Sequence, residues 1–210
     1  MFAKSDSRPP LRNLGRKRKG VFAAGPNEHD LTLLSDGKTL MVVTRIDGGD
    51  GRPPYCASQH TVKNYHSLFS TDGGTTWTKP TPMRDVTGRG IGTAYPRLLK
   101  VGNTLLLSGG RLMTEGLIDI ELWVNSDGMG KVWDQAHSIS YQHNRNVVNP
   151  LHKLFWQVNT TDSTNSTTSY TSLVPVSETE AVILYECHMV SGDPMKVGAH
   201  GAFSMKITVA

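Results

Sequence analysis

The sequence predicts an all-β domain, and two observations support this prediction. The 210 residues include 21 Gly and 11 Pro, whereas only 19% are charged. Short apolar runs alternate with turn signals such as Asp-Gly and Gly-Asn, a pattern typical of antiparallel strands joined by tight turns. A chain of this length can form one sizeable domain but not two large ones.

The first β-rich unit is expected from about Gly25 to Met83. The segment LTLLSDGKTLMVVTR reads as two strands around an Asp36-Gly37 turn. A Gly/Pro-rich loop, DGGDGRPP, follows it, and then the strand-like run YHSLF leads into STDGGTTW at residues 70–77. This arrangement predicts a second hairpin with its tip at residues 70–77.

The segment STDGGTTW has the pattern of an Asp-box, a structural turn. Gly accepts positive φ, and the short Asp72 carboxylate can accept hydrogen bonds from nearby backbone N–H groups. The hydroxyl groups on either side can tie the turn, and the terminal aromatic ring can pack beneath it. We expect a turn without chemistry of its own, assigned to Ser70, Asp72, Gly74, Thr76 and Trp77.

Two further units follow the first. The second, from about Thr93 to Ser140, contains PRLLKVGNTLLLSGGR and then IELWVNSDGMGKVW, which resembles a decayed Asp-box with one extra residue before Trp133. The third, from about Thr168 to Ala210, reads YTSLVPVSETEAVILYE and ends in AFSMKITVA. Units of about 50–65 residues with four short strands each are typical of propeller blades. Three blades do not close a ring, because closed propellers have about 4–8.

The polar and charged segments of the chain indicate which binding partners and modifications to expect. Residues 1–20, which include GRKRKG, account for the net charge of +4, and without them the rest of the chain is near neutral; we interpret them as a disordered tail ahead of a domain at 21–210. A nuclear-localisation or nucleic-acid patch is the alternative. No aromatic residues interleave with this patch, so nucleic acid is not an expected partner. A polar loop is expected at 157–169, where the sequons at Asn159 and Asn165 fit chance in an Asn/Ser/Thr-rich tract.

The sequence gives no sign of a membrane-spanning, secreted, disulfide-rich or metal-binding protein. No run of about 18 apolar residues predicts a membrane span, and no secretory signal is visible, so the localisation stays unknown. Cys56 and Cys187 are far apart and indicate neither a disulfide framework nor a metal site. His29, His143 and His188 also lack metal-ligand spacing. We expect no metal and no cofactor.

Over about residues 22–210 the chain resembles the exo-α-sialidase (neuraminidase) family, six-bladed β-propellers with Asp-boxes. The segment NEHDLTLLSDGKTLMVVTR is similar to the fourth blade of that family. The resemblance implies that Glu28 partners the catalytic nucleophile and that Arg45 is the second member of an arginine triad. SGGR followed by IELWVNSDG is similar to the fifth blade, more loosely because LMTEGLID intervenes, and places Arg111 near the third triad arginine.

The segment SYTSLVPV…AVILYE resembles the sixth blade and implies that Tyr170 is the nucleophile and Glu186 orients a triad arginine. The implied activity is retaining hydrolysis that releases terminal sialic acid from a sialylated glycan. Guanidinium groups bind the substrate carboxylate bidentately. A neutral phenol suits an anionic substrate, and Glu28 would take the proton that the phenol loses. Water then resolves the covalent sialyl-enzyme.

Each of these residues also has a structural interpretation. Tyr170 fits an ordinary strand aromatic, and Glu28 fits a residue that opens a strand. Arg45 fits a salt bridge with Asp47 or Asp50. Arg111 fits a surface turn, and Glu186 at the end of an apolar strand calls for a charged partner. Arg97, beside a proline at a strand start, is interpreted as structural.

The chain departs from the family at its beginning. The Arg-Ile-Pro-type motif with the first triad arginine, and the aspartate that acts as general acid/base, are not found. The resemblance therefore covers the carboxy-terminal half, blades four to six, with a missing amino-terminal propeller half as an expected partner. Loss of the acid costs about 10²–10⁴-fold in rate, so we expect weak or no turnover. The alternative function is a non-catalytic Asp-box propeller module that binds glycan or protein.

Overall fold

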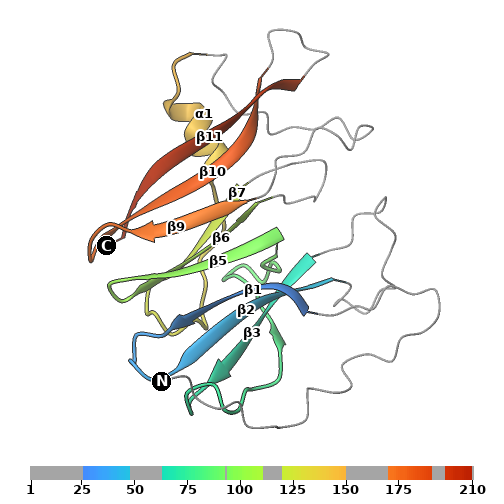
Figure 1. The fold of residues 1–210 in the computed structure, drawn as a ribbon, viewed down its shortest axis with the longest axis vertical. Helices are drawn as coiled ribbons and strands as arrows, with labels where there is room; N and C mark the ends of the chain where they lie inside the picture. The colour runs from blue at the N-terminus through green and yellow to red at the C-terminus, as the bar shows by residue number, and fades with distance from the viewer. Residues whose placement is uncertain are drawn as a thin grey trace, which may run out of the picture.

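The computed structural model describes residues 26–47, 63–92, 94–110, 120–149, 170–190 and 197–209. In this part of the chain three antiparallel sheets and one short helix are present (Figure 1). The prediction of an all-β chain is confirmed. Each sheet is a meander in which strands that follow one another in sequence are hydrogen-bonded neighbours.

The sheets agree closely with the three predicted units. The first has the order β1-β2-β3-β4 and the second has the order β5-β6-β7-β8. Their bounds are β1 Pro26–Leu33, β2 Leu40–Asp47, β3 Lys63–Ser70, β4 Thr81–Pro82, β5 Ala94–Val101, β6 Thr104–Gly110, β7 Ile120–Asn125 and β8 His137–Ser138.

The third sheet has the order β11-β10-β9, with β9 at Thr171–Pro175, β10 at Glu180–Val190 and β11 at Val197–Thr208. Within the described residues it has three strands where the sequence predicts four. The prediction also missed helix α1, Ile139–Asn146, whose N-cap Ser138 accepts a 3.0 Å hydrogen bond from the Tyr141 N–H. This cap satisfies one of the free N–H groups of the first turn.

The three sheets are stacked face to face, with the second between the other two (Figure 1). The first strands of the sheets are neighbours, because β5 contacts both β1 and β9. Strand β6 is buried along its whole length. Its side chains alternate between two cores: Leu105 and Leu107 face the first sheet, whereas Leu106 faces the third.

The Asp-box turn forms as predicted. The Asp72 carboxylate accepts hydrogen bonds from the Thr76 N–H at 2.8 Å and the Thr76 hydroxyl at 2.7 Å. The Ser70 hydroxyl donates to Asp72 at 2.8 Å and accepts from the Gly74 N–H at 2.9 Å. The Trp77 indole N–H closes the turn on the Gly74 carbonyl at 3.0 Å. These hydrogen bonds fix the hairpin tip and leave the Asp72 carboxylate fully engaged.

The decayed box in the second sheet keeps the second half of this turn. Trp133 donates to the Gly130 carbonyl at 3.0 Å, with the same spacing as Trp77 and Gly74. Asn125 takes the place of Ser70, because its side-chain oxygen accepts from the Gly130 N–H at 2.8 Å. The extra residue therefore lies between Asn125 and Gly130.

Some predictions lie outside the described residues. They concern the basic tail at 1–20, Cys56, Arg111, and the polar loop at 157–169 with Asn159 and Asn165. The side chains of Cys187 and His188 also lie outside them. In the part of the chain that is described, no helix is long and apolar enough to cross a membrane.

Candidate functional site

The candidate site lies where the first strands of the three sheets begin. Glu28 in β1 and Tyr95 in β5 sit at register shifts of their ladders, between Asn27 and His29 in one case and between Ala94 and Arg97 in the other. Such bulges redirect side chains and are common beside active sites. Irregular backbone in two neighbouring sheets therefore marks the position of the site.

Glu28 and Tyr95 share an uncommon conformation. Their φ angles are 40° and 54°, and no other non-glycine residue in the described ranges has a positive φ. A bulky residue in this region costs about 1–3 kcal/mol, and such strain clusters at functional sites. The surrounding contacts must hold both residues in place.

The Glu28 carboxylate joins the first and second sheets. Its Oε2 accepts a 2.8 Å hydrogen bond from the Tyr95 N–H and forms an ion pair with the Arg45 guanidinium. The strand register brings Arg45 close to Glu28, because Arg45 lies opposite Asn27, the residue before Glu28, in the β1–β2 ladder. The side chains of Glu28 and Arg45 are only 20% and 11% exposed, so water screens this pair weakly.

Tyr170, at the start of the third sheet, packs on Tyr95. The two rings are stacked with centroids 4.1 Å apart and planes at 30°. A hydrogen bond with the Tyr170 side chain raises the pKa of Tyr95, as do its partial burial and the negative charge of Glu28. Tyr170 is 47% exposed. Tyr95 thus links Tyr170 to Glu28.

Strand β9 is held against the second sheet by two hydrogen bonds next to Tyr170, one from β5 and one from β6. The Arg97 Nε donates to the Thr171 carbonyl at 3.2 Å, which agrees with the structural role predicted for Arg97. The hydroxyl groups of Ser108 and Thr171 are 2.8 Å apart and both side chains are buried. The position of Tyr170 therefore depends on the joint between the second and third sheets.

A shallow open depression of about 400 Å³ adjoins Tyr170 on the third sheet. Its surface is mostly apolar, with contributions from Leu184, Tyr185 and Phe203, whereas hydroxyl groups and one carboxylate supply the polar part. The half-buried Glu186 is the carboxylate, so this predicted residue lies on the same depression as Tyr170. Its lining includes Tyr170, Ser172, Leu184, Glu186, Ala202 and Ser204.

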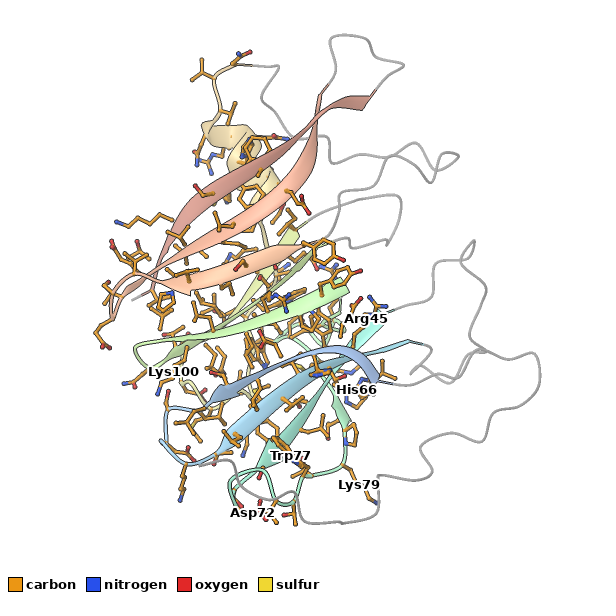
Figure 2. All side chains as sticks on the ribbon, viewed as in Figure 1. Arg45, His66, Asp72, Trp77, Lys79 and Lys100 are labelled. Carbon is orange, nitrogen blue, oxygen red and sulfur yellow. The ribbon has the colours of Figure 1, made fainter. Side chains whose placement is uncertain are left out.

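The structure thus brings together Glu28, Arg45 and Tyr170 through Tyr95, and it describes no position for Arg111. Figure 2 shows Arg45 at one end of the sheets and the Asp-box residues Asp72 and Trp77 at the far end of the first sheet. The box therefore shapes a hairpin away from the site.

Tyr95 is a site residue that the sequence patterns did not indicate. The sequence gives no signal for it, because Pro96 favours extended backbone at the residue before it, whereas Tyr95 has a φ of 54°. Of the histidines considered, His29 is exposed on β1, and His143 is buried with its Nδ1 2.8 Å from the Tyr185 hydroxyl.

No family model matches this chain, and no curated protein shows significant similarity to it.

Proposed function

We propose that the chain is a sialidase-type β-propeller module that acts on sialylated glycans, with Tyr170 as nucleophile and Glu28 as its base. The cluster of Arg45, Glu28, Tyr95 and Tyr170 carries this proposal. It joins residues far apart in sequence at one end of three sheets. A phenol, a carboxylate and a guanidinium are the groups that a retaining sialidase uses.

Two features support the propeller architecture. Every sheet is an antiparallel meander, and the first strands β1, β5 and β9 are neighbours. Propellers arrange blades in this way around a central axis, and ligands bind where the inner strands begin or end. The starts of β1, β5 and β9 would then surround the axis, where the candidate cluster lies.

The proposed reaction has two steps. The Tyr170 oxygen attacks C2 of the sialoside, the bond from C2 to the leaving oxygen breaks with its electron pair, and the phenol proton passes to Glu28. Water then attacks C2 and the bond from C2 to the Tyr170 oxygen breaks with its electron pair. Glu28 returns its proton to the phenol oxygen, and the proton that the water loses passes to solvent. Two displacements at C2 retain its configuration.

Charge complementarity also favours an anionic sugar. A guanidinium can bind a carboxylate with two parallel hydrogen bonds, and weak screening strengthens the contact. Arg45 is half-buried beside Glu28 and is close enough to lower the pKa of Tyr95, although burial and hydrogen bonding outweigh that effect. We assign Arg45 to both the Glu28 ion pair and the substrate carboxylate.

One observation favours the second candidate, a propeller module that binds sialylated glycan without hydrolysing it. Asp30 is the first aspartate after Glu28, and its carboxylate accepts hydrogen bonds from the N–H groups of Leu31 at 2.9 Å and Leu98 at 2.8 Å. Because this carboxylate accepts hydrogen bonds from backbone N–H groups, we do not assign it as the acid that protonates a leaving group.

The test is hydrolysis of an aryl sialoside, whose leaving group departs without protonation, so that the reaction does not depend on a general acid. We expect slow turnover in the unmodified chain and a loss of at least about 10²-fold in Tyr170→Phe. Tyr141→Phe, at an exposed position on α1, is the matched control and should retain full activity. Binding of the sialoside without turnover would favour the second candidate, and turnover unaffected by Tyr170→Phe would contradict the first.

A further inference from the structure

We propose that Tyr95 is a positioning residue for Tyr170: it holds the Tyr170 ring by stacking and keeps a hydroxyl group against the Tyr170 oxygen. This inference rests on the proposed function, in which Tyr170 is the nucleophile. It adds a residue that the resemblance to sialidases does not supply.

The stack limits where the Tyr170 ring can go. With centroids 4.1 Å apart and planes at 30°, the rings are in direct contact over their faces. Tyr170 is 47% exposed, so much of its surface meets solvent and gives no restraint. A side chain held on one face by an aromatic ring loses rotational freedom before the substrate arrives. Such pre-organisation favours the reactive geometry.

The backbone of Tyr95 is held in a strained conformation by contacts with both neighbouring sheets. Its φ of 54° is strained, and its N–H donates to Glu28 at 2.8 Å. The Arg97 side chain two residues later donates to the Thr171 carbonyl at 3.2 Å, adjacent to Tyr170. The bulge is therefore fastened to the first sheet on one side and to the third sheet on the other. Strain held by contacts on both sides is typical of a functional site.

The Tyr95 hydroxyl has a role when Tyr170 loses its proton. As the Tyr170 oxygen attacks C2, its proton passes to Glu28, and a hydrogen bond from Tyr95 steadies the oxygen in line with C2. The hydrogen bond to Tyr170 is the largest cause of the raised pKa of Tyr95. Because this hydrogen bond raises the pKa of Tyr95, it favours the protonated form of Tyr95, which agrees with Tyr95 as the donor.

The experiment is covalent trapping by a 3-fluorosialosyl fluoride, followed by intact mass and peptide mapping. The bond from the Tyr170 oxygen to C2 forms, the bond from C2 to fluorine breaks, fluoride leaves and Glu28 takes the phenol proton. Fluoride needs no general acid, so trapping reports on nucleophile and positioning alone. We expect adduct on Tyr170 in the unmodified chain and the same rate in the control Tyr141→Phe.

Two variants separate the ring of Tyr95 from its hydroxyl. Tyr95→Phe retains the stack and should slow trapping on the order of tenfold, through loss of one hydrogen bond. Tyr95→Ala removes the stack as well and should slow trapping on the order of 100-fold, with partial rescue in Tyr95→Phe. Circular dichroism checks that each variant is folded. Equal trapping rates in the unmodified chain, Tyr95→Phe and Tyr95→Ala would overturn the positioning role and leave Tyr170 as nucleophile.

A second measurement does not require a reaction. Tyrosine ionisation followed at 295 nm should include a group that titrates above the usual range, and Tyr170→Phe should lower the pKa of that group. If Tyr170→Phe leaves the titration unchanged, the link between the two hydroxyl groups is absent and the inference fails. If the titration shifts but no adduct forms on Tyr170 in the unmodified chain, the proposed function fails while the link itself stands.

Discussion

The main-chain N–H of Tyr95 donates a 2.8 Å hydrogen bond to Oε2 of Glu28, so two residues with positive φ in neighbouring sheets hold each other in place. The same carboxylate oxygen pairs with Arg45. Glu28 is therefore a joint between the first two sheets as well as the proposed base. A change at Glu28 should affect stability and chemistry together.

Glu28→Gln should destabilise the fold. The amide keeps an acceptor for the Tyr95 N–H but loses the charge that pairs with the mostly buried Arg45. We expect the free energy of unfolding to fall by about 1–3 kcal/mol, measured by urea denaturation. Glu178→Gln, at an exposed position, is the control and should stay within about 0.5 kcal/mol of the unmodified chain. Equal midpoints for the two variants would show that the Glu28–Arg45 pair does not contribute to stability.

The Asp-box should make the stability of the fold depend on pH in the acidic range. Hydrogen bonds, first from the Thr76 N–H and then from the Thr76 hydroxyl, lower the pKa of Asp72 from 3.8 to about 2. Because the folded-state pKa is depressed, the contribution of Asp72 is fully present above the unfolded value. That contribution is lost as the pH falls toward the folded value. The melting temperature of Asp72→Asn should therefore lie below that of the unmodified chain at pH 6, and the gap should shrink between pH 4 and pH 2.

Asp36 should behave in the same way, because hydrogen bonding, chiefly from the Thr39 hydroxyl, also lowers its pKa from 3.8 to about 2. Asp134→Asn, at an exposed position outside both turns, is the control. A gap between Asp72→Asn and the unmodified chain that stays constant from pH 6 to pH 2 would contradict the role of the charged Asp72.

Local turn chemistry is the part of this fold that the sequence predicts best. Asp-Gly turns and the Asp-box depend on residues within four positions of one another, so their hydrogen bonds can be written down before the sheets are known. Glu28 and Tyr95 are different, because their contact spans 67 positions. It requires the bulges of β1 and β5 to meet, and a bulge has no reliable signature in a single sequence.

Helix α1 was missed for a related reason. Its eight residues, ISYQHNRN, contain only one aliphatic side chain and no apolar stripe. Its place is set by tertiary contacts: Ile139 is in the core beneath the third sheet, and His143 contacts Tyr185. A short helix fixed by its neighbours gives little periodic signal.

Gly128 and Gly73 offer a matched test of how the first and second sheets fit together. Both have positive φ, 64° and 68°. A Cβ at Gly128 would clash with the Ser35 hydroxyl oxygen, between β1 and β2, and with the Asn103 carbonyl oxygen, whereas a Cβ at Gly73 would meet nothing within 4 Å. Gly73→Ala should cost about 1 kcal/mol from backbone strain alone. Gly128→Ala should cost about 2–4 kcal/mol, because overpacking adds to the same strain.

Urea denaturation of both alanine variants measures the difference. Gly128 also accepts a 3.1 Å hydrogen bond from the Ser35 N–H through its carbonyl group, so its turn contacts the first sheet directly. Equal losses for the two variants would mean that the hairpin tip at Gly128 can move away from Asn103 without cost.

A double-mutant cycle should measure the coupling free energy between the buried hydroxyl groups of Ser108 and Thr171. The oxygens are 2.8 Å apart, and the side chains are 0% and 5% exposed. Thr171→Val or Ser108→Ala leaves the other hydroxyl without this partner in the interior, so each single variant should lose about 1–2 kcal/mol. The double variant leaves neither hydroxyl, so its loss should be smaller than the sum by about 1 kcal/mol. Strict additivity would show that the two hydroxyl groups do not bond. If they do bond, Thr171→Val should also slow covalent trapping, because Thr171 fixes the start of the strand that carries Tyr170.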